Sequence, residues 1–318
     1  MKVLDKNDLK LWYCQPADEW VEALPIGNGK LGAMVFGHIE HERIQLNEET
    51  LWDGHKFNRN NPEALNALPK VRQLLFEGKN QEATDLAAEK MMGIPPRIKS
   101  YQSVGDLRLK FDHTLDQCQQ YHRELDLNIG VVRTCYNHNS ASYIREIFSS
   151  APDNVIVIQL SCDVPKKISF TATFSREQDA HCQLISKDHI ILSGKIGTDG
   201  LKFEAHMQAS TNSGSIRTED KNLVVENADE VTLIITASTS YINQNDTSAD
   251  PRMLCENTLN QAKVKPYEML YKDHISDHQS LFHRVEINLG KTIEMPTDHR
   301  LDRLKSGNQD PDLFALYF

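Results

Sequence analysis

The sequence predicts a mainly-β protein, in which a large antiparallel sandwich carries a helical insert near its start and is followed by helices. Three observations predict this fold class. Many short segments between residues 105 and 240 alternate apolar and polar residues or form β-branched runs. Turn signals such as Asp199-Gly200 and Asn212-Ser213-Gly214 separate them, and no helical pattern intervenes. Such strands are expected to pair antiparallel, and so many of them need two large stacked sheets.

The first 52 residues read as short strands and turns, because four closely spaced glycines disfavour a long helix. A helical insert is predicted over about residues 61–92. Asn61 can cap its first helix, Pro62 suits the first position, and Gly78 is a plausible end. The apolar residues of this helix recur at helical spacing: Leu65, Leu68, Val71, Leu74 and Leu75. A second helix is predicted over residues 81–92, ended by Gly93.

The strand region that follows is recognised by its alternating or continuous apolar residues. Its clearest members are Leu107, Leu109 and Phe111, then 155–158, then Ile168, Phe170, Ala172 and Phe174, then Phe203, Ala205 and Met207, and finally 231–235. The alternating segments predict strands with one buried face, and the β-branched runs predict strands buried on both faces.

After Pro251 the pattern becomes helical again. Helices are predicted over residues 252–263 and 266–284, followed by a short strand over residues 285–289 and a polar connector. Asp310 and Pro311 are a suitable N-cap and first-turn proline for one further helix. This helix would have about two turns before the sequence stops, so we expect a truncated chain.

The composition excludes several classes of function. The net charge is −10, which argues against a nucleic-acid surface, and no run approaches the ~20 apolar residues that a membrane span needs. We therefore expect neither nucleic acid nor a membrane as a partner. The N-terminus has no apolar signal-peptide core. The expected location is the cytoplasm if Met1 is native, and secreted or periplasmic if an export signal was removed.

No metal site or cofactor is predicted. The six cysteines are scattered without a close pair. In the segment 38–42, His38 and Glu40 would share one face of a strand and His41 the other, so they would not converge. His274 and His278 have zinc-compatible spacing on a helix but no evident third ligand, which favours packing. Residues 27–32 match GxGxxG, yet a strand follows them where a dinucleotide site needs a helix, so we predict a hairpin turn.

One polar and aromatic cluster has the mixture of groups that binds sugars. It comprises Asn47, Glu48, Glu49 and Trp52, and Tyr101 and Gln102 form a similar but less specific set. Carboxylates and amides bond hydroxyl groups, and an indole covers the C–H face of a sugar ring. The alternative is a structural turn in which Trp52 fills the sandwich core, and the residues alone leave both open. Nothing identifies a catalytic pair of carboxyls, because Glu48 and Glu49 should point to opposite faces.

The segment 24–52, LPIGNGKLGAMVFGHIEHERIQLNEETLW, resembles the opening of glycoside hydrolase family 95, the α-L-fucosidases that remove terminal fucose with inversion. Further segments continue the likeness over nearly the whole chain. They are residues 60–65, 72–78, 101–107 (with Ser103 in place of the usual proline), 121–127, 143–148, 151–153, 239–241, 281–285, 296–301 and 310–311. Each segment is unspecific, but the combination is specific.

The resemblance implies an N-terminal β-supersandwich over residues 1–250, a helical linker over 251–309, and at 310–318 the first helix of an α/α barrel. The family's general acid and base lie in that barrel, so no catalytic residue is expected before Phe318. The resemblance also implies that Asn47, Glu48, Glu49 and Trp52 face the barrel at the mouth of the pocket. We expect a fucosylated oligosaccharide to bind through the barrel, and this chain alone to be inactive. The rival hypotheses are an α-L-galactosidase, a free carbohydrate-binding module and a structural scaffold.

Overall fold

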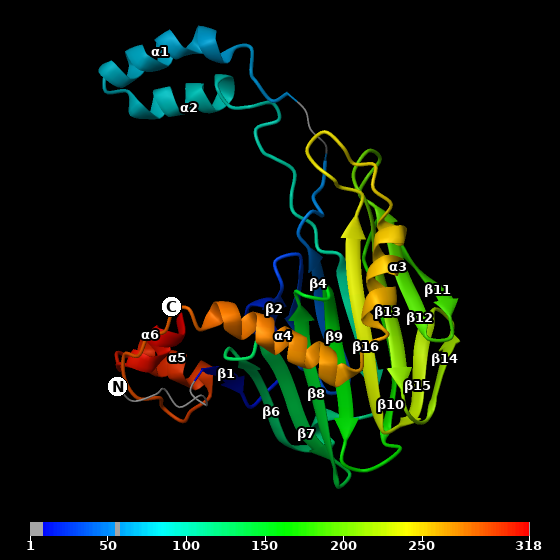
Figure 1. Cartoon of the computed structure of the whole chain (residues 1–318). Helices are drawn as coiled ribbons and strands as arrows, with labels where there is room; N and C mark the ends of the chain where they lie inside the picture. The colour runs from blue at the N-terminus through cyan, green and yellow to red at the C-terminus, as the bar shows by residue number, and fades with distance from the viewer. Residues whose placement is uncertain (1–8, 55–57, 318) are drawn as a thin grey trace.

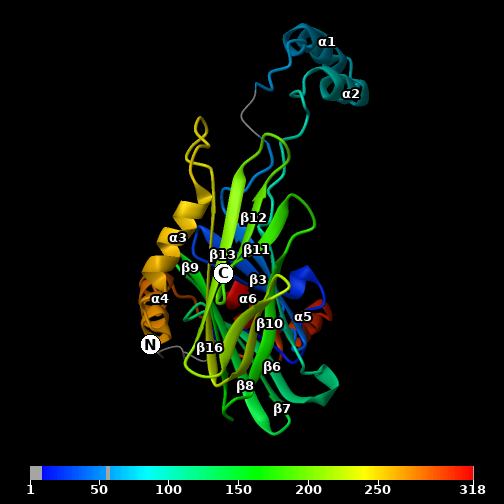
Figure 2. The same ribbon diagram turned by 90° about the vertical axis from the view of Figure 1, so that its right-hand side faces the viewer.

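The computed structural model describes residues 9–54 and 58–317, and its centre is two stacked antiparallel sheets (Figures 1 and 2). The larger sheet has nine strands in the order β1-β6-β7-β8-β9-β16-β13-β12-β11. Its strands are β1 Lys10–Tyr13, β6 Cys118–Asp126, β7 Val131–His138, β8 Ala141–Ser150, β9 Val155–Cys162, β11 Ala180–Ser186, β12 His189–Lys195, β13 Lys202–Thr211 and β16 Glu230–Thr239. The predicted mainly-β sandwich is confirmed.

The smaller sheet has seven strands in the order β14-β15-β10-β5-β4-β3-β2. Its strands are β2 Leu24–Gly27, β3 Leu31–Val35, β4 His41–Glu48, β5 Gly105–Phe111, β10 Ile168–Ser175, β14 Ser215–Glu219 and β15 Asn222–Ala228. Alternate residues of these strands face the larger sheet, as the period of two requires. Two single-turn 3-10 helices complete the sandwich, η1 Trp20–Glu22 and η2 Leu115–Gln117.

The GxGxxG segment is a hairpin, as predicted. Strand β2 pairs antiparallel with β3, and the turn between them is closed by the side chain of Asn28. Its Oδ1 accepts hydrogen bonds from the amides of Lys30 (2.9 Å) and Leu31 (2.7 Å). Gly29 has φ +90°, a conformation that costs glycine little. A strand therefore occupies the place where a phosphate-binding helix would begin.

The predicted insert is a helical hairpin of α1 Ala64–Phe76 and α2 Asn80–Lys90. Its first helix begins two to three residues after the predicted start, and Asn61 Oδ1 accepts a hydrogen bond from the amide of Glu63 just before it (2.9 Å). The hairpin has a small core of its own around Val71, Leu74 and Ala83. Figure 1 shows it standing clear of the sandwich.

Two helices after β16, α3 Pro251–Ala262 and α4 Tyr267–Phe282, confirm the helices predicted there. They cover the outer face of the larger sheet (Figure 1), where Leu259 and Leu270 pack on a second apolar cluster that includes Phe148. The side chain of Asp250 caps α3 by accepting hydrogen bonds from the amides of Arg252 and Met253. No helix within residues 9–54 and 58–317 has the length and apolarity to cross a membrane.

The strand predicted over residues 285–289 is wrong. Val285 and Leu289 are at least half exposed, and none of the described strands pairs with this segment. The predicted polar connector instead contains α5 Thr297–Lys305, and α6 Pro311–Tyr317 follows as predicted. Helix α5 is stabilised by a buried Arg300, whose guanidinium donates to both oxygens of Asp310 (2.8 and 2.7 Å). That pairing was not foreseeable from an apolar pattern.

Candidate functional site

A groove of about 530 Å³ lies at the end of the sandwich where β4 and β16 finish. One wall comes from the segments around Trp52 and Lys99, and the other from Leu201 and the loop after β16. Its lining residues are Glu49, Thr50, Trp52, Asp53, Gly54, Arg59, Ile98, Lys99, Leu201, Tyr241, Asn243, Gln244 and Thr247. The two walls thus belong to different sheets.

Trp52 lines one side of this groove and packs against Tyr101. Trp52 and Tyr101 face each other across an antiparallel bridge, and their rings meet edge to face with centroids 5.3 Å apart. The bridge is extended by hydrogen bonds from the amide of Gln102 to Leu51 O (2.9 Å) and from the amide of Asp53 to Ser100 O (3.0 Å). Trp52 is 44% exposed, so the alternative in which it fills the sandwich core is wrong.

Glu48 and Glu49 point to different environments, as the strand geometry predicts. Glu48 is buried below the groove, where its Oε2 accepts hydrogen bonds from the amide (2.8 Å) and the hydroxyl (2.7 Å) of Thr50. Burial raises the pKa of its carboxyl, and these hydrogen bonds lower it in part. Glu49 is exposed on the groove, and no ion pair engages it within the described chain. The two carboxyls therefore cannot flank one glycosidic bond.

The other predicted residues occupy different positions. Tyr101 donates a hydrogen bond from its hydroxyl to Glu48 O (2.8 Å), and burial raises its pKa. Gln102 turns away from the groove, because its Oε1 accepts a hydrogen bond from Arg176 (3.3 Å). Asn47 is half-buried on the face of β4 opposite to Glu48. The structure therefore gathers Glu48, Glu49, Trp52 and Tyr101 and separates Asn47 and Gln102 from them.

The cations of the groove are already engaged. Lys99 Nζ lies 3.2 Å from Asp53 Oδ2, and Arg59 donates to the carbonyl of Pro95 from two nitrogens (3.1 and 2.9 Å). The Glu49 carboxylate, which makes no ion pair with the described residues, and the amides of Asn243 and Gln244 remain as groups that can bond hydroxyls. Next to exposed aromatic rings, they form a surface suited to a neutral sugar.

Sequence reasoning missed the second wall. Tyr241, Asn243 and Gln244 carry an aromatic ring and two amides, the same mixture that identified the first wall. The signal was present directly after the apolar run of β16, but nothing in the sequence places that loop opposite Trp52. A second groove of similar volume, along β12, β13 and the start of α3, lacks this mixture because its one aromatic residue, Phe203, is buried.

The histidine motifs hold no converging ligand set. His274 and His278 donate hydrogen bonds from Nε2 to the carbonyls of Ile129 (2.9 Å) and Leu127 (2.8 Å), which attach α4 to the sheet. The packing interpretation of this pair is confirmed. Over residues 9–54 and 58–317, no three potential ligands cluster as a metal site would require.

The comparisons with known proteins place this two-sheet fold in a family. The chain belongs to the family of the glycosyl hydrolase family 65 N-terminal domain, whose model matches residues 11–244. The model of the glycosyl hydrolase family 95 catalytic domain matches residues 266–318.

Two curated relatives are fucosidases by name. The chain is 33% identical to alpha-L-fucosidase 2 of Arabidopsis thaliana over 98% of its own length and 41% of that protein. It is 28% identical to probable alpha-fucosidase A of Aspergillus niger, over 84% of this chain and 36% of that protein. The chain thus spans about two fifths of the length of these relatives. A solved structure, that of a putative kojibiose phosphorylase from human microbiome, aligns with 88% of this chain and with 38% of its own chain. The two are 13% identical, and the TM-score is 0.48.

Proposed function

We propose that this chain is the N-terminal, non-catalytic part of an inverting α-L-fucosidase-like glycoside hydrolase that removes terminal fucose from oligosaccharides. The observation that carries the proposal is the 33% identity to an alpha-L-fucosidase over 98% of the chain. The family 95 match over residues 266–318 supports it. The separated environments of Glu48 and Glu49 support a non-catalytic role, because hydrolysis with inversion needs two carboxyls about 6.5–9.5 Å apart across one bond.

In this proposal the barrel domain supplies the general acid and base, and packs against the helical linker. Residues 1–250 form the supersandwich, 251–309 the linker and 310–318 the first barrel helix. The groove contributes Glu49 and Trp52 to the mouth of the pocket, and Tyr101 and Glu48 support them from beside and below. Asn47 and Gln102 would then act at the domain interface rather than on the sugar.

The proposal is tested by comparing this chain with the protein extended through a complete family 95 catalytic domain. The chain alone should release no fucose from an aryl α-L-fucoside. The extended protein should release it, with the β anomer appearing first in a time-resolved NMR spectrum. First appearance of the α anomer would contradict inversion, and activity of the chain alone would contradict the non-catalytic role. Faster hydrolysis of the matching α-L-galactoside would favour the galactosidase alternative.

Trp52→Ala in the extended protein tests the role of the groove. Removing the indole should raise KM for a fucosylated oligosaccharide about tenfold, because one stacking face is lost. The thermal midpoint should fall little, since the ring is 44% exposed. Val21→Ala is a matched control, because this residue is exposed at a distance from the groove lining. An unchanged KM would contradict a role of Trp52 in substrate binding.

The groove also favours a second function, that of a carbohydrate-binding module. Its two lining aromatic residues, Trp52 and Tyr241, and the carboxylate of Glu49 lie within this chain, so sugar binding would not need another domain. Titration of the chain with a trisaccharide that ends in α-L-fucose, followed by tryptophan fluorescence, tests this. Saturable binding that Trp52→Ala abolishes would support a module. Absence of binding would contradict the module and favour the hypothesis of a structural scaffold.

A further inference from the structure

A line of polar groups crosses from one sheet to the other directly below the groove. Glu48 and Thr50 lie at the end of β4 in the smaller sheet, and Thr239 ends β16 in the larger sheet. The hydroxyls of Thr50 and Thr239 are hydrogen-bonded to each other. Thr239 Oγ1 also accepts a hydrogen bond from the amide of Tyr241 (3.2 Å). We call this line of Glu48, Thr50, Thr239 and Tyr241 the Glu48–Tyr241 bridge. It connects the two sheets at the base of the two groove walls.

Only one assignment of donors and acceptors is consistent with all the hydrogen bonds of the bridge. The Thr50 hydroxyl has a single hydrogen, which it donates to Glu48 Oε2 at 2.7 Å. Thr239 must therefore donate to Thr50, and the Thr239 oxygen accepts the hydrogen bond from the amide of Tyr241. Each donor points toward the carboxylate of Glu48, and hydrogen bonds that end on a charged acceptor are stronger than neutral ones.

Both walls of the groove are connected to this bridge. On the side of the smaller sheet, Tyr101 donates to the carbonyl of Glu48, and Trp52 packs on Tyr101. On the side of the larger sheet, Tyr241 begins the loop that contributes Asn243 and Gln244. Thr239 is 3% exposed, so its hydroxyl has the protein rather than solvent as its partner.

We propose that the Glu48–Tyr241 bridge sets the width of the groove, and that Glu48 and Thr239 are positioning residues for the ligand. Neither side chain lines the groove. On one side they act through Tyr101, which packs against the lining residue Trp52, and on the other through Tyr241, which lines the groove itself. The part of this inference that concerns a glycan rests on the proposed function, whereas the positioning of the walls does not.

The test compares three variants of the whole chain. Thr239→Val removes the hydroxyl at nearly constant volume, and Thr239→Ser keeps it. Thr232→Val is the matched control: this residue lies on the same strand, its hydroxyl donates to Gln159 Oε1 (2.6 Å), and seven residues of strand put it about 23 Å away. Amide hydrogen exchange is measured in each variant without ligand, and a trisaccharide ending in α-L-fucose is then titrated in.

Thr239→Val should raise exchange about tenfold at Tyr241 and at Trp52, because the walls lose their shared anchor. Binding of the trisaccharide should weaken about fivefold, the effect of one lost hydrogen bond. Thr239→Ser should restore both, and Thr232→Val should change neither. Exchange that is unchanged in Thr239→Val, or that rises equally throughout the sandwich, would overturn the positioning role. If exchange rises locally but the wild-type chain binds no trisaccharide, the positioning role stands and the glycan assignment of the groove fails.

Discussion

Glu42 and Arg145 form an ion pair between the two sheets that is almost completely shielded from water. Their side chains are 0% and 2% exposed. Glu42 also accepts hydrogen bonds from the amides of Gly37 (2.9 Å) and Arg43 (3.1 Å). The guanidinium of Arg145 lies 4.9 Å from the ring centroid of Phe111. These contacts offset part of the desolvation of both charges, while Arg145 Nε is buried without a hydrogen-bond partner among the described residues.

Arg145→Met should destabilise the sandwich by about 3–5 kcal/mol, because it leaves the Glu42 carboxylate buried without a counter-charge. Urea unfolding at neutral pH measures this. The double variant Glu42→Leu/Arg145→Met should be more stable than the single one, since it removes both charges together. Arg217→Met, which removes two solvent-exposed ion pairs, should show no measurable change. A double variant less stable than Arg145→Met would contradict the explanation.

Only one half of this pair could be read from the sequence. Strand alternation places Glu42 on the inward face of β4 together with Ile44 and Leu46. Its partner lies 103 residues further along the chain, and no local pattern identifies it. The same limit applies to Thr50 and Thr239, which are 189 residues apart.

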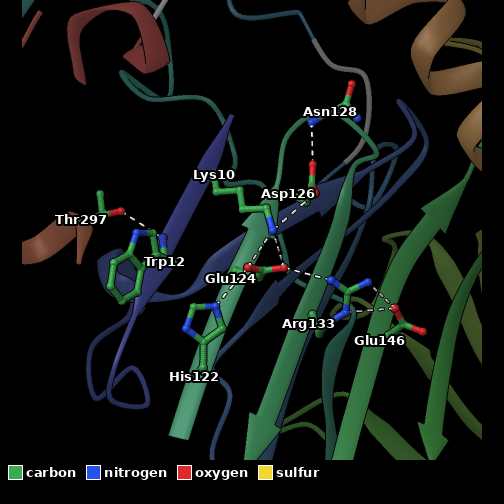
Figure 3. A network of polar contacts seen from close by, with 9 residues as sticks. All are labelled: Lys10, Trp12, His122, Glu124, Asp126, Asn128, Arg133, Glu146 and Thr297. Carbon is green, nitrogen blue, oxygen red and sulfur yellow. Dashed lines mark hydrogen bonds and ion pairs between the residues drawn. The ribbon is translucent and has the colours of Figure 1, made fainter. Parts of the chain in front are cut away.

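At the scale of elements, a polar network on the larger sheet (Figure 3) extends to helix α4. Glu124 on β6 is the centre of this network. Its carboxylate accepts hydrogen bonds from the side chains of Lys10 (3.1 Å), His122 (3.0 Å) and Arg133 (2.9 Å). Arg133 also binds Glu146, whose other oxygen accepts a hydrogen bond from the hydroxyl of Tyr267 on α4.

The pKa of Glu124 gives this network a dependence on pH. Burial alone would raise it, but hydrogen bonds from His122 and Lys10 and the charge of Arg133 lower it to about 2. Because the folded-state pKa lies below the ordinary value, the ionised carboxyl contributes stability above about pH 4.5, and this contribution is lost as the pH falls toward 2.

Glu124→Gln should therefore lower the free energy of unfolding by about 3 kcal/mol at pH 7 and by little at pH 2. Urea unfolding curves recorded from pH 7 to pH 2 measure the difference. Glu256→Gln on the exposed side of α3 is the control, and should follow the wild-type chain throughout. If Glu124→Gln lowers the free energy of unfolding equally at pH 7 and at pH 2, the lost contact and not the ionisation of the carboxyl stabilises the protein.

Elements with a strong apolar period were predictable, and those stabilised by charge were not. The sandwich strands, the insert and helices α3 and α4 follow from periods of two and 3.6. Helix α5 has few apolar residues, and its order depends on the buried pairing of Arg300 with Asp310 and Asp312. The segment 285–289 shows the opposite error, a predicted strand that does not form. Alternation of apolar residues alone does not provide a neighbouring strand to pair with.

At the scale of the whole molecule, the helical hairpin α1–α2 has a core separate from that of the sandwich. The two ends of the insert lie close together, because the amide of Ile94 donates to the carbonyl of Arg59 (3.0 Å). The hairpin is therefore attached at one narrow place, as Figure 1 shows. Sequence analysis predicted its existence but not its distance from the sheets.

Replacing residues 60–93 with two glycines should leave the sandwich folded, because no buried residue of its main core lies in that segment. The urea midpoint should stay within the error of measurement, while the m-value falls slightly with the surface removed. Pro69→Ala within the hairpin is a milder comparison. A large loss of the midpoint on deletion would show that the hairpin supports the sandwich.

The contact between Trp12 and Thr297 has a consequence for how the molecule avoids self-association. Strand β1 is the last strand of its sheet, so its outward amides could pair with a strand of another copy. The hydroxyl of Thr297, at the first turn of α5, accepts the amide of Trp12 (3.0 Å), as Figure 3 shows. Helix α5 thus covers an open edge that would otherwise be a template for aggregation.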